Sequence, residues 1–295
     1  MHCRYLSTGL FLILLAVSLV APSVPVFASD GAKEKQDTVT VRVETRQIYS
    51  SDVEGTPGEI EITESKLNVS YGSTLSNQMP LALFMDIKHM EIDDSTAMVL
   101  PSHLESRSIG IGTKFPVPFL DLENYYMGTD IYPTMNTDGW DWEDSALRMP
   151  FRSYVIYKPS ETFLFVAGVL VRIDYDEEVL PIIGFIYKPN DRLTFNFASD
   201  DPHVSYRINE KLTAFWELGF TYDEYEVTRQ GKKGVILKYR ETSTGAGLRY
   251  AVADVVDASL SAGGVFNRKL EYRDGTSWIE PEATPYARAK IDVHF

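Results

Sequence analysis

The stretch SDDPH brings together the residues with the clearest potential for chemistry, because Asp200 and Asp201 stand next to His203. Two carboxylates beside an imidazole can orient a general base, as in a hydrolase, or bind a metal ion. The competing interpretation is a polar turn, since Asp-Asp-Pro is common turn chemistry. We favour the turn, so Asp200, Asp201 and His203 are only weak metal candidates. No catalytic residue is predicted, and the chain lacks the GxSxG and HExxH motifs of hydrolases.

A second set of candidates consists of charged residues that alternate with apolar ones. In TPYARAKIDVHF, every second residue is charged or polar, and those between them are small or apolar up to Phe295. Successive side chains of a strand point to opposite faces, so such a segment has one polar and one apolar face. The polar faces predict a set of residues that line an interior: Arg207, Lys211, Glu217, Arg249, Arg288, Lys290 and Asp292.

These residues belong to a series of alternating segments that extends through the chain. We expect about fourteen strands, at 38–49, 60–72, 79–91, 104–115, 123–133, 148–158, 162–173, 179–188, 192–198, 203–208, 211–227, 236–250, 255–268 and 284–295. Many match the roughly 9–11 residues that cross a bilayer at a tilt, against about 5–6 for globular strands. The pattern predicts an all-β fold, an antiparallel up-and-down transmembrane β-barrel of about 14 strands (12–14).

The expected connections are of two kinds, which roughly alternate along the chain. Short turns lie at 158–161, 188–191, 209–211 and 251–254. Longer, polar and often acidic connections lie at 51–59, 92–103, 134–146, 174–178, 229–234 and 271–283. Outer-membrane barrels have short periplasmic turns and longer external loops, so both chain ends are expected on the periplasmic side. The acidic external loops predict a preference for cations.

The start of the chain predicts export. Residues 1–28 have a cationic beginning, an apolar run and small residues before Ala28, as in a secretory signal peptide. Cleavage after Ala28 leaves residues 29–295 as a single outer-membrane barrel domain. The only cysteine, Cys3, lies in the removed part, so the mature chain has no disulfide or thiolate metal site. The formal net charge of −14 argues against nucleic acid as a partner.

The end of the chain resembles the C-terminal assembly signal of Gram-negative outer-membrane proteins. Phe295 is the aromatic last residue, and Val293 and Ile291 are the apolar residues on the same face. Lys290 occupies the place where that signal usually has glycine. The resemblance implies the barrel-assembly machinery as a partner.

More broadly, the chain resembles an outer-membrane β-barrel family known only as a domain of unknown function in Gram-negative genomes. The resemblance covers most of residues 120–295 and rests on ENYYMGTDIYPTMNTDG, PIIGFIYKPNDRLTFNF, PHVSYRINEKLTAFWELG and TGAGLRYAV. It implies a barrel in the outer membrane and a role in transport, and it supplies no catalytic residues.

Three functions follow as hypotheses. The first is a monomeric, porin-like channel or transporter for small solutes, without a cofactor and in contact with outer-membrane lipid and lipopolysaccharide. The second is a structural or surface-interaction barrel with a plugged lumen. The third is an outer-membrane hydrolase that uses the surroundings of Asp200 and His203, at a predicted external turn. The interior charges fit the first two equally, because they can line a water path or pair with one another.

Overall fold

The computed structural model describes residues 37–74, 80–116, 124–140 and 144–295. The expected signal peptide at 1–28, Cys3 and parts of the connections at 75–79 and 117–123 lie outside the described residues. The elements are β1 (Thr38–Val53), β2 (Thr56–Thr74), β3 (Pro80–Asp94), β4 (His103–Pro116), β5 (Tyr125–Ile131), β6 (Thr134–Thr137), the 3₁₀ helix η1 (Asp144–Ala146), β7 (Leu147–Arg148), β8 (Phe151–Ser160), β9 (Phe163–Val171), β10 (Val179–Tyr187), β11 (Leu193–Asn196), β12 (His203–Arg207), β13 (Leu212–Arg229), β14 (Lys232–Ala253), β15 (Val256–Tyr272), β16 (Trp278–Ile279) and β17 (Thr284–His294). Within these residues, no helix is long and apolar enough to cross a membrane.

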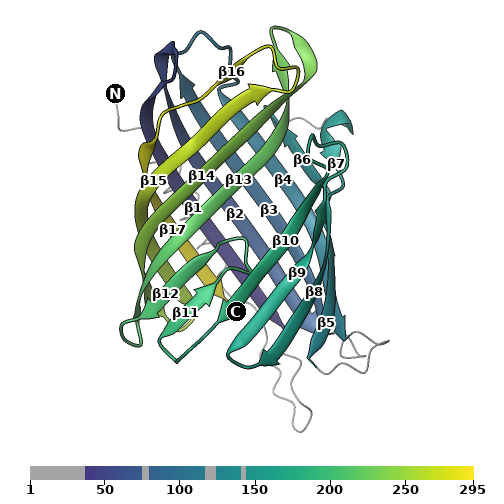
Figure 1. Ribbon diagram of the computed structural model, residues 1–295, viewed down its shortest axis with the longest axis vertical. Coiled ribbons are helices and arrows are strands. Elements are labelled where there is room, and N and C mark those ends of the chain that lie inside the picture. Colours follow the sequence, from purple (N-terminus) through teal and green to yellow (C-terminus); the bar gives the residue numbers. More distant parts are fainter. Residues whose placement is uncertain (1–36, 75–79, 117–123, 141–143) are drawn as a thin grey trace.

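The antiparallel sheet closes on itself as a ring of 14 strands (Figure 1). The order around the ring is β1, β2, β3, β4, β5, β8, β9, β10, β11, β12, β13, β14, β15 and β17. The ring closes between β1 and β17, where Val41 pairs with Val293. The backbones of Val39 and Phe295 also exchange two hydrogen bonds of 3.0 and 2.9 Å there. The expected fold class and strand number are therefore confirmed.

Two connections that the sequence predicts as long loops are tight hairpins instead. β1 continues to Val53 and β2 begins at Thr56, inside the expected loop 51–59. β13 and β14 are joined through Gln230 and Gly231, with positive φ of 49° and 81°. Two residues of positive φ suit a type I′ turn, whose twist matches that of the flanking strands. The strands thus extend through polar residues that their composition alone assigns to loops.

The strands on one part of the ring are much longer than those on another part. β13 and β14 have 18 and 22 residues, and β1 to β4 have between 14 and 19. In contrast, β11 and β12 have only 4 and 5 residues and occupy the lower end of the wall in Figure 1. The long strands therefore extend beyond the upper end of the short ones.

Along the long strands, the face that points into the barrel is polar in the lower part and apolar in the upper part. In the lower part of β2, Lys66 and Asn68 line the interior, and Val69 lies on the opposite face. In the upper part, Ile62 points inward and is fully buried, while Glu61 on the outer face is exposed. The lower part thus has the pattern of a membrane barrel, and the upper part has the pattern of a water-soluble sheet.

A dry core fills the upper part of the barrel between β1–β4 and β13–β15. Its buried members are Ile48, Val53, Ile60, Ile62, Met90, Ile92, Met98, Leu104, Tyr225, Val227, Leu237, Tyr239, Val265, Leu270, Tyr272, Ile279 and Tyr286. The short strand β6 adds to this closure, because it pairs with β4 and makes a single bridge to β13 on the opposite side of the ring. An open axial pore therefore does not continue through this part of the ring.

Candidate functional site: the interior of the barrel

Below the dry core, the ring encloses a cavity with two regions of about 930 and 980 Å³. The first, here called the charged region, lies along β1–β3, β13, β14 and β17. The second, the apolar-walled region, lies along β8–β10, where Ile156, Leu164, Val166, Ile182 and Ile186 form its wall. The two regions share Asp86, Arg172 and Tyr222 among their lining residues, so they form one continuous interior.

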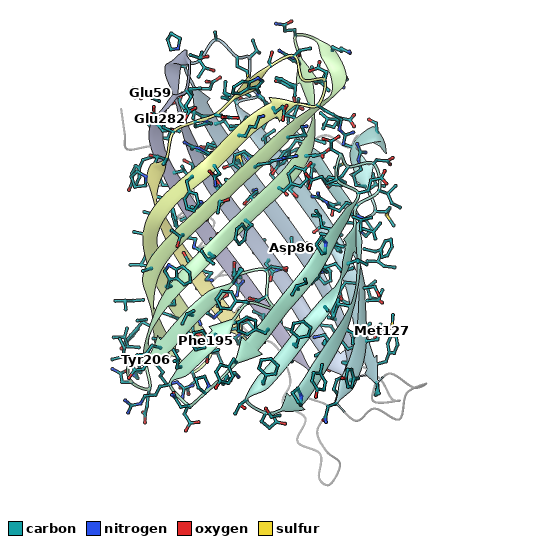
Figure 2. The ribbon with its side chains drawn as sticks, viewed as in Figure 1. Glu59, Asp86, Met127, Phe195, Tyr206 and Glu282 are labelled. Atoms are coloured by element: carbon teal, nitrogen blue, oxygen red, sulfur yellow. The ribbon has the colours of Figure 1, made fainter. Side chains whose placement is uncertain are left out.

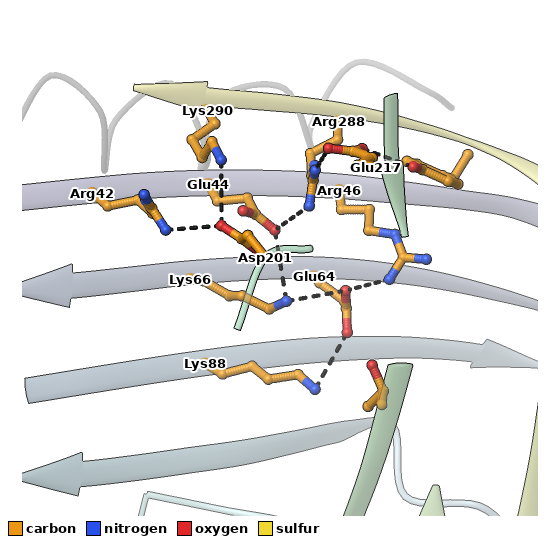
Figure 3. A network of polar contacts seen from close by, with 12 residues as sticks. Arg42, Glu44, Arg46, Glu64, Lys66, Lys88, Asp201, Glu217, Arg288 and Lys290 are labelled. Carbon is orange, nitrogen blue, oxygen red and sulfur yellow. Dashed lines mark hydrogen bonds and ion pairs between the residues drawn. The ribbon is translucent and has the colours of Figure 1, made fainter. Parts of the chain in front are cut away.

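A network of ion pairs crosses the charged region (Figure 3). Asp201, from the connection between β11 and β12, accepts from Arg42 of β1 at 2.9 Å and lies 3.5 Å from the Lys290 ammonium of β17. Arg42 also pairs with Asp292 at 2.6 Å. These contacts hold the β11–β12 connection against strands on another side of the ring.

Glu217 of β13 is the centre of a second cluster. Its carboxylate accepts hydrogen bonds from Tyr286 Oη and Ser261 Oγ, both at 2.9 Å, and pairs with the Arg288 guanidinium. Arg288 also approaches Glu44 at 3.7 Å. Because Glu217 is buried, these donors replace the water that its charge loses on folding.

A third cluster lies directly beneath the dry core. Arg46 pairs with Glu64 at 3.1 Å and with Glu241 at 2.5 Å, and its guanidinium lies 4.6 Å from the centre of the Tyr286 ring. Lys88 adds a second cation at 3.4 Å from Glu64. This layer marks the change from the polar interior to the dry core.

The residues predicted to line the interior have different positions in the structure. Four line the charged region, namely Glu217, Arg249, Arg288 and Lys290. Asp292 is buried in its ion pair with Arg42. Arg207 and Lys211 are exposed and do not line either region, because β12 ends at Arg207 and Lys211 belongs to the turn that follows. Their place in a lining of the interior stays a prediction.

The SDDPH turn lies inside the barrel rather than at its external rim. β11 and β12 are too short to reach the upper end, so their connection enters the cavity. Asp200 pairs with Arg152 of β8 at 3.1 Å, and His203 Nδ1 lies 2.7 Å from the backbone oxygen of Asp201. The imidazole is therefore oriented by a carbonyl and not by a carboxylate. In the described part of the chain, no group of three His, Cys, Asp or Glu residues could hold a metal ion.

Gly184 of β10 allows this connection to turn inward. A Cβ atom at Gly184 would lie 2.3 Å from the backbone oxygen of Phe197 and 2.7 Å from Cα of Ala198. Such distances are far below van der Waals contact, so any side chain there would displace the backbone that leads to Asp201. The glycine thus positions the acidic side chain that crosses the cavity.

The wall has a gap above β11 and β12, between β10 and β13. The β10–β11 ladder ends at Ile186 and the β12–β13 ladder ends at Glu217, and each is followed by one more backbone hydrogen bond. Figure 2 shows Phe195 of β11 and Tyr206 of β12 at the lower end of the wall. The apolar-walled region extends to this gap, because its lining includes Ile183 and Phe220, whose side chains are 74% and 71% exposed. The interior therefore approaches the outer surface through the side of the barrel.

The connection between β9 and β10, residues 172–178, closes the gap at its upper end. Arg172 donates to the backbone oxygen of Tyr222 at 3.0 Å and lies between the rings of Tyr175 and Tyr222, at 4.7 and 4.5 Å. Asp176 binds Lys238 of β14 at 3.0 Å. The hydrogen bond and charge of Lys238 lower the pKa of the Asp176 carboxyl below its ordinary value.

Several charged residues of the interior were not among the predicted site residues. They are Arg42, Glu44, Arg46, Glu64, Lys66 and Lys88. The alternation of Val41 and Val43 with charged residues is the signal that could identify the first two. Arg46 and Glu64 are harder to predict, because just beyond them the residues on the same strand face, Ile48 and Ile62, are apolar.

Comparisons with known proteins give little information on function. No family model matches the chain, so the resemblance to a barrel family of unknown function stays a prediction. The chain is 29% identical over 115 residues to an uncharacterized protein of Chlamydia muridarum (strain MoPn / Nigg). That alignment covers 39% of this chain and 29% of the relative, so less than a third of the relative is matched.

Solved structures of similar shape are outer-membrane barrels. One is an outer membrane channel from Pseudomonas putida F1, 10% identical, with 91% of this chain and 100% of that chain covered and a TM-score of 0.49. Another is a Pseudomonas aeruginosa FadL homologue, 12% identical, with coverage of 88% and 89% and a TM-score of 0.46. At these scores the matches say nothing about what this chain binds.

Proposed function

We propose that this protein spans the outer membrane and is a channel for small solutes. The observation that carries the proposal is the continuous interior of two regions, about 930 and 980 Å³, inside a closed ring. Their volumes suit small molecules, since small-molecule sites measure roughly 300–1,000 Å³.

The outer surface of the lower wall supports the membrane location. Ile109, Ile183, Phe220 and Leu260 are each between 69% and 74% exposed and lie on four different strands. A ring of exposed apolar side chains is unfavourable in water and favourable in lipid. Contact with membrane lipid and lipopolysaccharide follows from this placement, and a monomer is sufficient because the ring closes within one chain.

The C-terminal residues are consistent with the proposed assembly signal. Ile291 and Val293 alternate with the buried Lys290 and Asp292, so they lie on the outer face of β17, and Phe295 is 48% exposed. An exposed apolar face that ends at the edge of the closing strand suits recognition by the barrel-assembly machinery before β1 and β17 pair.

The route of the solute is proposed to include the gap between β10 and β13. The dry core lies above the cavity, and β6 crosses to β13, so a straight axial path is obstructed. The gap is bordered by apolar side chains and reached by the apolar-walled region. Solutes with apolar parts would therefore pass through the side of the barrel more easily than ions with complete hydration shells.

The obstruction of the axial path favours a second candidate, a barrel with a plugged lumen. Asp201 crosses the cavity to Arg42 and Lys290, and a core of buried apolar and tyrosine side chains lies above it. In that case, the long outer connections would carry the function through contacts with external partners.

Conductance of the refolded mature chain in a planar bilayer separates the two candidates. We expect discrete steps for a channel, and we expect Asn68→Trp to reduce them because it fills the cavity beside Asp86. The matched control is Val69→Trp, which places the same side chain on the opposite face of β2. A folded, heat-modifiable barrel without steps would contradict the channel and support the plugged lumen.

A further inference from the structure

Positive side chains gather in the cavity although the protein as a whole is acidic. The chain has a formal net charge of −14. Nevertheless, nine lysine and arginine side chains and seven carboxylates line the two regions of the cavity. The acidic residues of the chain are thus placed mainly outside the cavity. Asp292 and Glu64 lie buried behind this lining, beside Arg42 and Lys88, so the cavity is close to neutral rather than strongly acidic.

Four of these cations lie in one row across the long part of the ring. Neighbouring strands pair in register at Arg249, Ser259, Lys290, Glu44, Lys66 and Lys88. Directly paired residues on one face of a sheet lie side by side, so four cations and one carboxylate form a continuous band. This band forms part of the lining of the charged region, where Figure 3 shows Lys290, Glu44, Lys66 and Lys88.

Arg249 differs from the other cations of the row. Lys290 is paired with Asp201, Lys66 with Glu44, and Lys88 with Asp223. Arg249 has no carboxylate within ion-pair distance among the described residues, and its buried Nε has no hydrogen-bond partner there. A guanidinium without a partner in a partly buried site has free donors directed at the cavity.

An apolar surface lies beside this free cation. The Arg249 guanidinium lies 5.7 Å from the centre of the Phe215 ring, which is buried against the interior. Farther across the cavity is the aliphatic wall of the apolar-walled region, with Leu164 and Ile186. One charged end and one apolar wall suit a solute that has both an anionic group and an apolar body.

We propose that Arg249 and the row beside it bind small organic carboxylates with an apolar or aromatic body. This inference rests on the proposed channel function and names its substrate class. A single unpaired guanidinium balances a monoanion, and its planar fork matches a carboxylate with two parallel hydrogen bonds. A phosphate dianion would leave a negative charge without a partner, so a carboxylate fits the site better.

Calorimetric titration of the refolded barrel in detergent micelles with benzoate tests the inference without any need for conductance. We expect benzoate to bind and Arg249→Gln to weaken its binding at least about tenfold, because a charge-assisted hydrogen-bond pair is lost. The matched control is Arg192→Gln, at an exposed arginine in the lower turn before β11, which should bind benzoate like the wild type.

Two further ligands define the chemical class. Benzyl alcohol has the same ring without the charge, and we expect it to bind much more weakly than benzoate. Phenyl phosphate has the same ring with a dianionic group, and we expect it to bind no more tightly than benzoate. The inference would be overturned if benzyl alcohol bound as well as benzoate or if phenyl phosphate bound more tightly. It would also be overturned if a folded Arg249→Gln protein bound benzoate as well as the wild type. Absence of benzoate binding by the wild type would overturn it as well, even if the barrel conducts. Benzoate binding by a barrel that does not conduct would instead contradict only the proposed channel.

Discussion

At the scale of single residues, the interior depends on charges that are satisfied by partners from other strands. Glu217 illustrates this, because β13 supplies the carboxylate while β15 and β17 supply Ser261, Tyr286 and Arg288. A buried charge is unfavourable unless hydrogen bonds and opposite charges replace its water. The cluster therefore links three strands that meet near the closure of the ring.

Replacement of Glu217 by glutamine should measurably weaken the barrel. Glutamine keeps the shape of the side chain but removes its charge, so Arg288 retains only the more distant Glu44 at 3.7 Å. We expect a loss of about 2 kcal/mol in the free energy of unfolding, measured by denaturant titration in detergent micelles. Glu210→Gln, at an exposed position of the lower turn, is the matched control. Equal stability of the two variants would mean that the Glu217 cluster contributes nothing.

At the scale of elements, sequence periodicity predicts the strands well and their surroundings less well. The segments at 192–198 and 203–208 correspond to β11 and β12. However, the turn between them was expected outside and lies in the cavity. Alternation reveals which residues share a face, but it does not reveal how high a strand reaches relative to its neighbours. For the same reason, alternation alone does not show that β12 ends at Arg207, at the lower end of the wall.

The connection 172–178 is an element whose docking should depend on pH. Lys238 lowers the pKa of Asp176 below its ordinary value of 3.8, so the docked form gains stability above that pH. This stabilisation is lost as the pH falls through the lowered pKa. We expect a nitroxide on Glu178→Cys to be immobile at neutral pH and mobile well below the ordinary pKa. Residues 29–295 contain no cysteine, so the label is specific in a protein prepared without residues 1–28.

Asp176→Asn in the labelled protein is the control for this titration. Glu177 and Glu224 also form ion pairs at this connection, with Arg240 and Arg273, so Asp176 is one of several carboxylates that hold it. If Asp176 carries the effect, the Asn variant will be more mobile already at neutral pH and will change less on acidification. Identical pH profiles with and without Asp176 would contradict the assignment.

At the scale of the whole molecule, the exchange of faces along the long strands divides the barrel into two environments. The lower part has a polar interior and an apolar surface, while the upper part has a dry core and a polar surface. Polar and apolar residues alternate with the same period in both parts. Alternation therefore predicts one long strand, but it does not show where the polar face changes from the inside to the outside of the barrel. The lengths of β13 and β14, at 18 and 22 residues, exceed the roughly 9–11 that a bilayer needs. We expect this excess to project above the membrane.

Tryptophan quenching by lipids with brominated acyl chains tests this division. Trp216 of β13 is 43% exposed on the apolar surface, and Trp278 of β16 is 52% exposed at the upper end, with Lys269 at 5.1 Å from its ring. The chain has four tryptophans, so two variants can each keep one of these and carry phenylalanine at the other three. We expect strong quenching of Trp216 and little quenching of Trp278, because only the former contacts acyl chains. Similar quenching of both would show that lipid covers the upper part as well, which its exposed carboxylates make unfavourable.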